Sequence, residues 1–135
     1  MTALDRRTTP TPDRTVSDRI ARVLLRVAAV GALASALLAA GEVASADGAT
    51  KMALTWQAYG LVVFAGLFAL LARRPRGYRG VWELVIFHKV ALTVTAAAYA
   101  AHGGIEGTGA VLVGDGIVSA LLIAAYVLAR GWSRG

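Results

Sequence analysis

The sequence predicts an all-α protein, a four-transmembrane-helix bundle whose N- and C-termini both lie in the cytoplasm. Three observations lead to this prediction. Of the 135 residues, 57% are hydrophobic and 16% are charged, whereas an ordinary soluble domain carries about 25% charged residues. Four long apolar stretches alternate with short polar segments. Of the 14 basic residues, all except Lys51 and Lys89 are arginines, and these arginines lie only in alternate polar segments or beside them.

The first 19 residues precede any long apolar stretch. They include Pro10, Pro12, several threonines and the first arginines of the chain. A segment so poor in apolar residues cannot bury enough surface to offset the entropy lost on ordering it. Residues 1–19 are therefore predicted to be a disordered basic arm in the cytoplasm.

The first two membrane spans are expected at about 20–40 and 53–72. A helix needs about 20 mostly apolar residues to cross the hydrocarbon core, and residues 53–72 supply them without a charge. Arg22 and Arg26 interrupt the start of the first span, where their long side chains reach the membrane surface. A seam of small residues, which favours close helix packing, runs along this span at alanines 28, 32, 36 and 40.

A competing interpretation of the first span is a cleaved secretory signal peptide. Ala44-Ser45-Ala46 matches the small-residue pattern at which such peptides are cleaved, and the uncharged apolar stretch before it is short. The sequence leaves open whether this site is cleaved.

The third and fourth spans are expected at about 80–101 and 107–129. The membrane domain then covers residues 20–130, and residues 131–135 form a cytoplasmic tail. Aromatic residues near the predicted span ends are typical of the belt at the membrane surface; they are Trp56, Tyr59, Trp82 and Trp132.

The arginines determine the predicted orientation, because Lys and Arg concentrate in the cytoplasmic segments of membrane proteins. They lie in the N-terminal arm and the start of the first span, in the segment 73–79 and at the C-terminal end. The segments 41–52 and 102–109 carry acidic residues and, apart from Lys51, no Lys or Arg. The alternation places both termini inside.

Ionisable residues inside the last two spans are the candidates for function. A charge within a span is costly and usually faces the bundle interior or a cavity. At 1.5 Å per residue, Lys89 lies about 13 Å and Asp115 about 20 Å from the inner face of the membrane core. A Lys side chain can cover most of this gap, so we expect a buried ion pair, with Thr95 close to the level of Asp115. The candidate buried polar cluster consists of Glu83, His88, Lys89, Thr95, Tyr99 and Asp115.

An outer polar pocket is predicted next to this cluster. Glu42, Gln57 and His102 lie near the outer ends of their spans, where they join Thr95, Tyr99 and Asp115 in a pocket open to the outside. Each candidate also has a purely structural interpretation. The Lys89–Asp115 pair then only holds the bundle together, Glu83 pairs with Arg79 or Arg76, and His88 is a neutral hydrogen-bonded residue.

The sequence contains no recognisable catalytic motif. It has no Gly-Lys-Ser/Thr phosphate loop, no Gly-x-Ser-x-Gly elbow, no His-Glu-x-x-His and no cysteine. We therefore predict no catalytic residues, no metal site and no cofactor.

The net charge of +6 would suggest nucleic acid in a soluble protein. Apolar spans separate the basic clusters here, so no nucleic-acid binding is expected. The bilayer itself is the expected partner, with anionic lipid head groups at Arg73, Arg74, Arg76 and Arg79.

The run from Arg76 to Leu84 (RGYRGVWEL), then His88-Lys89 and Gly114-Asp115-Gly116, resembles uncharacterised small four-helix integral membrane proteins of actinobacteria. In size and helix count the chain is also similar to the DoxX-like group, in architecture alone. Small multidrug-resistance transporters share the size but carry a Glu within the first span. The first span here has none in its middle, which argues against that family.

These observations predict a small multi-pass protein of the bacterial plasma membrane with a structural, accessory or partner-binding role. A homo-oligomer or a membrane partner fits this role. Two alternatives remain open. One is a small proton-coupled transporter that uses Asp115, Lys89 and His88. The other is a membrane enzyme acting on a lipid or isoprenoid, with Glu83, His88 or Asp115 as acid or base.

Overall fold

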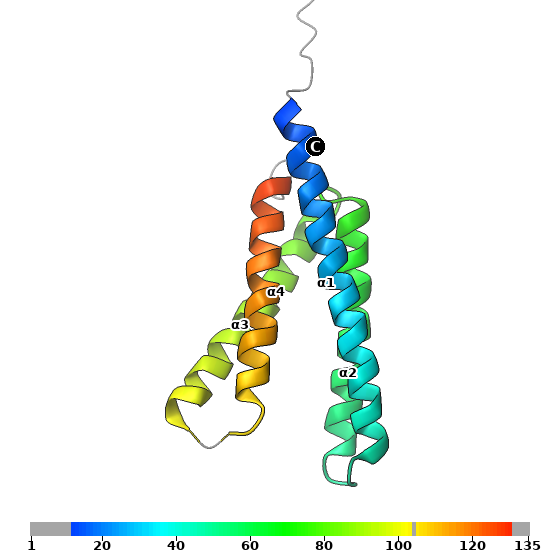
Figure 1. Cartoon of the computed structure of the whole chain (residues 1–135), viewed down its shortest axis with the longest axis vertical. Helices are drawn as coiled ribbons and strands as arrows, with labels where there is room; N and C mark the ends of the chain where they lie inside the picture. The colour runs from blue at the N-terminus through cyan, green and yellow to red at the C-terminus, as the bar shows by residue number, and fades with distance from the viewer. Residues whose placement is uncertain (1–11, 104, 131–135) are drawn as a thin grey trace, which may run out of the picture.

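The computed structural model describes residues 12–103 and 105–130, and the chain is helical over most of this length (Figure 1). Its four helices are α1 (Pro12–Ser45), α2 (Lys51–Arg73), α3 (Arg79–His102) and α4 (Thr108–Ala129). Each is long and apolar enough to cross a membrane. The prediction of an all-α chain with four potential spans is confirmed. The last three helices lie within two residues of the expected bounds at either end.

Helix α1 differs most from its predicted range. It begins at Pro12 rather than at residue 20 and continues to Ser45. Proline is favoured in the first turn of a helix, where its fixed φ fits and its missing N–H is not needed. Asp18 is also held in place, because its carboxylate accepts a hydrogen bond of 2.8 Å from Arg76. Residues 12–19, predicted to be disordered, are therefore helical, whereas residues 1–11 and the tail 131–135 lie outside the described residues.

Two short turns on the same side of the molecule reverse the chain. In the turn after α1, the Asp47 carboxylate accepts hydrogen bonds from the Thr50 hydroxyl (2.8 Å) and the Thr50 N–H (2.9 Å). These hydrogen bonds lower the pKa of Asp47 below its ordinary value. The turn between α3 and α4 uses positive φ at Gly103 (74°) and Gly107 (80°), a region that glycine enters without steric cost.

The helices associate as two antiparallel pairs, α1 with α2 and α3 with α4. Helix α1 also packs on α4, whereas α2 and α3 contact each other less than any other touching pair. The buried residues of α1 follow one seam at intervals of three or four, as a helical period requires. They are Ala21, Leu25, Ala28, Ala32, Ala36 and Ala39. The predicted seam is correct as far as residue 36, after which the period brings Ala39 inward and leaves Ala40 exposed.

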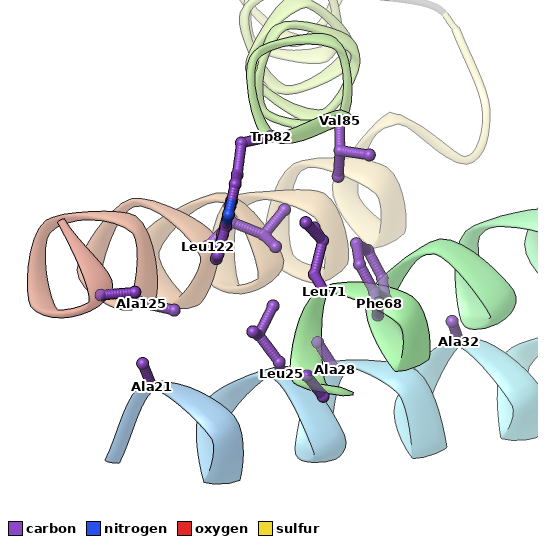
Figure 2. Packing of buried hydrophobic residues seen from close by; sticks show 12 residues of the cluster. Ala21, Leu25, Ala28, Ala32, Phe68, Leu71, Trp82, Val85, Leu122 and Ala125 are labelled. Atoms are coloured by element: carbon purple, nitrogen blue, oxygen red, sulfur yellow. The ribbon is translucent and has the colours of Figure 1, made fainter. Parts of the chain in front are cut away.

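The hydrophobic core lies at the arginine-rich end of the molecule. Figure 2 shows Trp82 of α3 and Leu122 of α4 meeting Leu71 and Phe68 of α2 above the alanine seam of α1. Trp82 is completely buried, and its indole N–H donates to the Pro75 carbonyl at 2.6 Å. It is therefore part of the core, which corrects its assignment to the aromatic belt.

The two helix pairs diverge from this core toward the turns at 46–50 and 103–107 (Figure 1). All four helices contribute to the core at one end. Toward the turn at 46–50, α1 buries only the small residues Ala36 and Ala39. The molecule is thus a packed bundle at one end and two separate helical hairpins at the other.

Candidate functional site

Lys89 of α3 and Asp115 of α4 form the predicted ion pair. The Lys89 Nζ lies 2.6 Å from Asp115 Oδ1, and the two side chains are 7% and 17% exposed. Breaking such a pair leaves a buried charge without a partner, which costs about 3–5 kcal/mol. The contact therefore fixes the register of α3 against α4.

Neighbouring side chains support the Lys89 ammonium. It lies 4.6 Å from the centroid of the Phe64 ring, a cation–π contact. The Phe64 ring also lies 4.5 Å from that of His88. Sequence reasoning missed Phe64, because it considered only polar residues within the spans.

Thr93, rather than Thr95, supports the ion pair. The Thr93 hydroxyl donates to the Lys89 carbonyl at 2.9 Å and lies 3.4 Å from the Ser119 hydroxyl. The position of Thr93 follows from helix geometry, since four residues past Lys89 is about 40° around the helix and six residues is about 240°. Thr95 lies in a shallow hollow on another side of α3, together with Glu83 and Tyr126.

The ion pair lies in the wall of a cavity of about 880 Å³, called the α2–α3 groove below. Residues of α2, α3 and α4 line it, and α1 contributes none. Its surface is mostly apolar. The lining residues are Met52, Ala53, Trp56, Gln57, Gly60, Leu61, Phe64, His88, Lys89, Leu92, Val111 and Asp115.

The groove brings together only some of the predicted site residues. Gln57, His88, Lys89 and Asp115 line it, whereas Glu42, Thr95, Tyr99 and His102 do not. Four of the six residues predicted for the outer pocket therefore lie outside the groove. These residues are separated because the two helix pairs diverge toward the turns at 46–50 and 103–107 (Figure 1).

The remaining outer residues satisfy local contacts. The Nδ1 of His102 lies 2.7 Å from the Ala98 carbonyl of its own helix. The side chain of Glu42 is exposed, and its backbone carbonyl accepts a hydrogen bond of 3.2 Å from Ser45. Tyr99 is 47% exposed.

The partners expected for Glu83 also change. The Tyr126 hydroxyl donates to Glu83 Oε1 at 3.0 Å. Arg76, one of the two arginines expected to pair with Glu83, binds other groups. Its Nη2 lies 2.8 Å from Asp18 of α1, and its Nε donates to the Ala129 carbonyl at the end of α4 at 3.1 Å.

Glycines beside Asp115 play unequal roles. A Cβ at Gly116 would meet the Thr93 methyl at 3.7 Å, whereas a Cβ at Gly114 would meet nothing within 4 Å. Gly116 thus faces α3, and Gly114 does not.

Within residues 12–103 and 105–130, no three His, Asp or Glu side chains are grouped to hold a metal ion. No protein-family model, curated protein or solved structure matches the chain.

Proposed function

We propose that this chain is a multi-pass accessory protein of the bacterial plasma membrane with both termini in the cytoplasm. Four apolar helices support the membrane placement. The orientation is supported by charge. The start of α1, the turn between α2 and α3 and the end of α4 carry the arginines, and the two opposite turns carry Asp47 and Glu106.

One observation favours a structural role over a catalytic one, namely the Lys89–Asp115 pair. The two charges satisfy each other at 2.6 Å, and Phe64 covers the ammonium. A general acid or base must reach a substrate atom, whereas this carboxylate already binds a cation of its own chain. The pair thus joins α3 to α4 rather than serving a reaction.

A double-mutant cycle tests this proposal. Asp115→Asn and Lys89→Met should each lower the free energy of unfolding by about 3 kcal/mol, because each leaves an unpaired buried charge. The double variant removes both charges and should regain most of the lost stability. Thermal unfolding of the four proteins in one detergent measures this. A single variant as stable as the wild type would contradict the structural role.

A proton-coupled carrier is the second candidate, because His88, Lys89 and Asp115 all line one groove. A carrier needs ionisable groups that face a cavity within the membrane. Proteoliposomes loaded with a pH-sensitive dye separate the two candidates. Proton uptake by the wild type, lost in a stably folded double variant, would favour the carrier.

The arginine-rich turn is proposed to contact anionic lipid heads through Arg73, Arg74 and Arg79. Arg73 and Arg74 are exposed, and Arg73 lies in the last turn of α2. Arg76 is excluded from this set because its guanidinium is bound to Asp18 and to the Ala129 carbonyl.

A further inference from the structure

We propose that the α2–α3 groove holds one acyl chain of an outer-leaflet phospholipid, which enters sideways between α2 and α3. The assignment to the outer leaflet rests on the membrane orientation proposed above. Four features of the groove support an acyl chain as the occupant: its opening, its walls, its polar atoms and its length.

The opening faces the surrounding bilayer. Residues of α2 and α3 form the two sides of the groove, and part of α4 forms its back. Helices α2 and α3 contact each other less than any other touching pair. No helix of the described chain therefore closes the groove between them, and a lipid chain can enter without crossing a packed interface.

The walls are apolar. Trp56 and Phe64 contribute aromatic surface, and Leu61, Leu92 and Val111 contribute aliphatic surface. The cavity of about 880 Å³ lies within the range of roughly 300–1,000 Å³ found for small-molecule sites.

The polar atoms of the groove offer no net charge to a ligand. Lys89 and Asp115 neutralise each other, and their side chains are largely covered. One face of the His88 ring is covered by Phe64. A charged or strongly polar solute would lose its hydration here without gaining a counter-charge. The chemistry therefore favours hydrocarbon.

The length of the groove matches one leaflet. It extends along α2 from Met52 to Phe64, which is about 18 Å at the rise of an α-helix. Half of the hydrocarbon core is about 15 Å, whereas a transmembrane helix needs the full 30 Å or so. Beyond Phe64 the core residues Phe68, Leu71 and Trp82 are fully buried and close the inner end. The groove is thus too short for a partner's membrane span and suits an acyl chain.

Two glycines of α2 provide a matched pair of variants. Gly60 lines the groove, and a Cβ there would meet no atom within 4 Å. Gly66 has the same open surroundings but does not line the groove. Gly60→Trp should therefore fill the groove, and Gly66→Trp adds the same side chain elsewhere on the helix. Neither change forces a clash at the Cβ, and both replace a poor helix former.

The experiment is photo-cross-linking in lipid nanodiscs. Purified protein is placed in phosphatidylcholine that contains a trace of phosphatidylcholine with a diazirine on one acyl chain. After illumination, mass spectrometry locates the labelled residues. The lipid-facing residues Leu38 and Leu84, 73% and 70% exposed, report ordinary contact with the bilayer.

We expect labelling at Leu61, Phe64 and Leu92 to exceed that at Leu38 and Leu84 several-fold. Gly60→Trp should remove this excess, and Gly66→Trp should leave it unchanged. Equal labelling of groove and lipid-facing residues would overturn the proposal, as would an excess that Gly60→Trp does not reduce. Weaker labelling in the groove than at Leu38 and Leu84 would also overturn it, because another occupant, such as a second copy of the chain, then excludes lipid.

Folding is checked on the same samples, because thermal unfolding shows whether Gly60→Trp remains native. If it does not, the smaller Gly60→Leu replaces it. The labelling pattern is independent of the Lys89–Asp115 stability cycle. A failure of the accessory role in that cycle therefore leaves the lipid proposal standing, and the reverse also holds.

Discussion

Phe64 is the residue that links α2 to the ion pair of the other helix pair. Its ring lies against both Lys89 and His88. Phe64→Leu should lower the free energy of unfolding by about 1–2 kcal/mol, because it removes a cation–π contact and leaves a partly filled space. Phe64→Tyr keeps the aromatic face and serves as the control. Urea or thermal unfolding in detergent measures the difference, and equal losses in the two variants would show that the aromatic face is unimportant.

Asp47 makes the turn between α1 and α2 sensitive to acid. Its pKa is lowered from 3.8 by the Thr50 hydroxyl and then by the Thr50 N–H. Because the pKa is lower in the folded state, the stabilisation from the ionised Asp47 carboxylate is fully present above about pH 4. It is lost as the pH falls through the folded pKa. The amide protection factor of Thr50 should decrease over that interval, and in Asp47→Asn it should already be low and vary less with pH.

The ion pair could be predicted at the level of single residues, but its surroundings could not. The helical rise places Lys89 and Asp115 within about 7 Å in depth, and a Lys side chain covers most of that distance. The exception is Thr93, which lies one turn past Lys89 on the same face of α3 and could have been chosen over Thr95. The prediction of an outer pocket assumed that the outer ends of the helices meet. No residue pattern indicated that they diverge.

At the scale of elements, the side chain of Arg76 joins three parts of the fold. From the turn between α2 and α3 it binds Asp18 of α1 and the last carbonyl of α4. The end of a helix leaves carbonyls without partners, so this donor also caps α4. Sequence reasoning placed Arg76 at the lipid surface, because it could not foresee these tertiary partners.

Arg76→Ala should destabilise the protein by about 1–2 kcal/mol through the loss of two hydrogen bonds, one of them to a charged group. Arg74→Ala removes the same charge from the same turn, at an exposed position, and should change stability little. Hydrogen exchange should also increase at the start of α1 in Arg76→Ala alone. Equal effects of the two variants would mean that only the net charge of the turn matters.

The helices themselves were predictable, because a span requires only enough consecutive apolar residues. The extra turns of α1 were not, since their composition favours disorder. The tertiary contact of Asp18 with Arg76 ties these turns to the rest of the fold. The grouping into two pairs likewise depends on which small and large residues meet, and hydropathy carries no information about that.

The topology of the whole molecule is open to a direct test, because the chain has no cysteine. A single cysteine in place of Gly48 should react with a membrane-impermeant thiol reagent in intact cells. A single cysteine in place of Ser133 should react only after the cells are opened. Reaction of both cysteines in intact cells would contradict the proposed orientation. Failure to label Gly48→Cys even in opened cells would instead indicate a poorly reactive thiol at that position.

The packed core at the arginine-rich end is the point about which the two helical hairpins can rotate. Trp82, Leu122 and Leu71 hold the hairpins together there, and beyond them the hairpins separate (Figure 1). A small rotation about this point moves Trp56 and Val111 much farther than it moves Phe68. The width of the groove therefore depends on the angle between the hairpins, and in the orientation proposed above the lateral pressure of the outer leaflet acts on this angle.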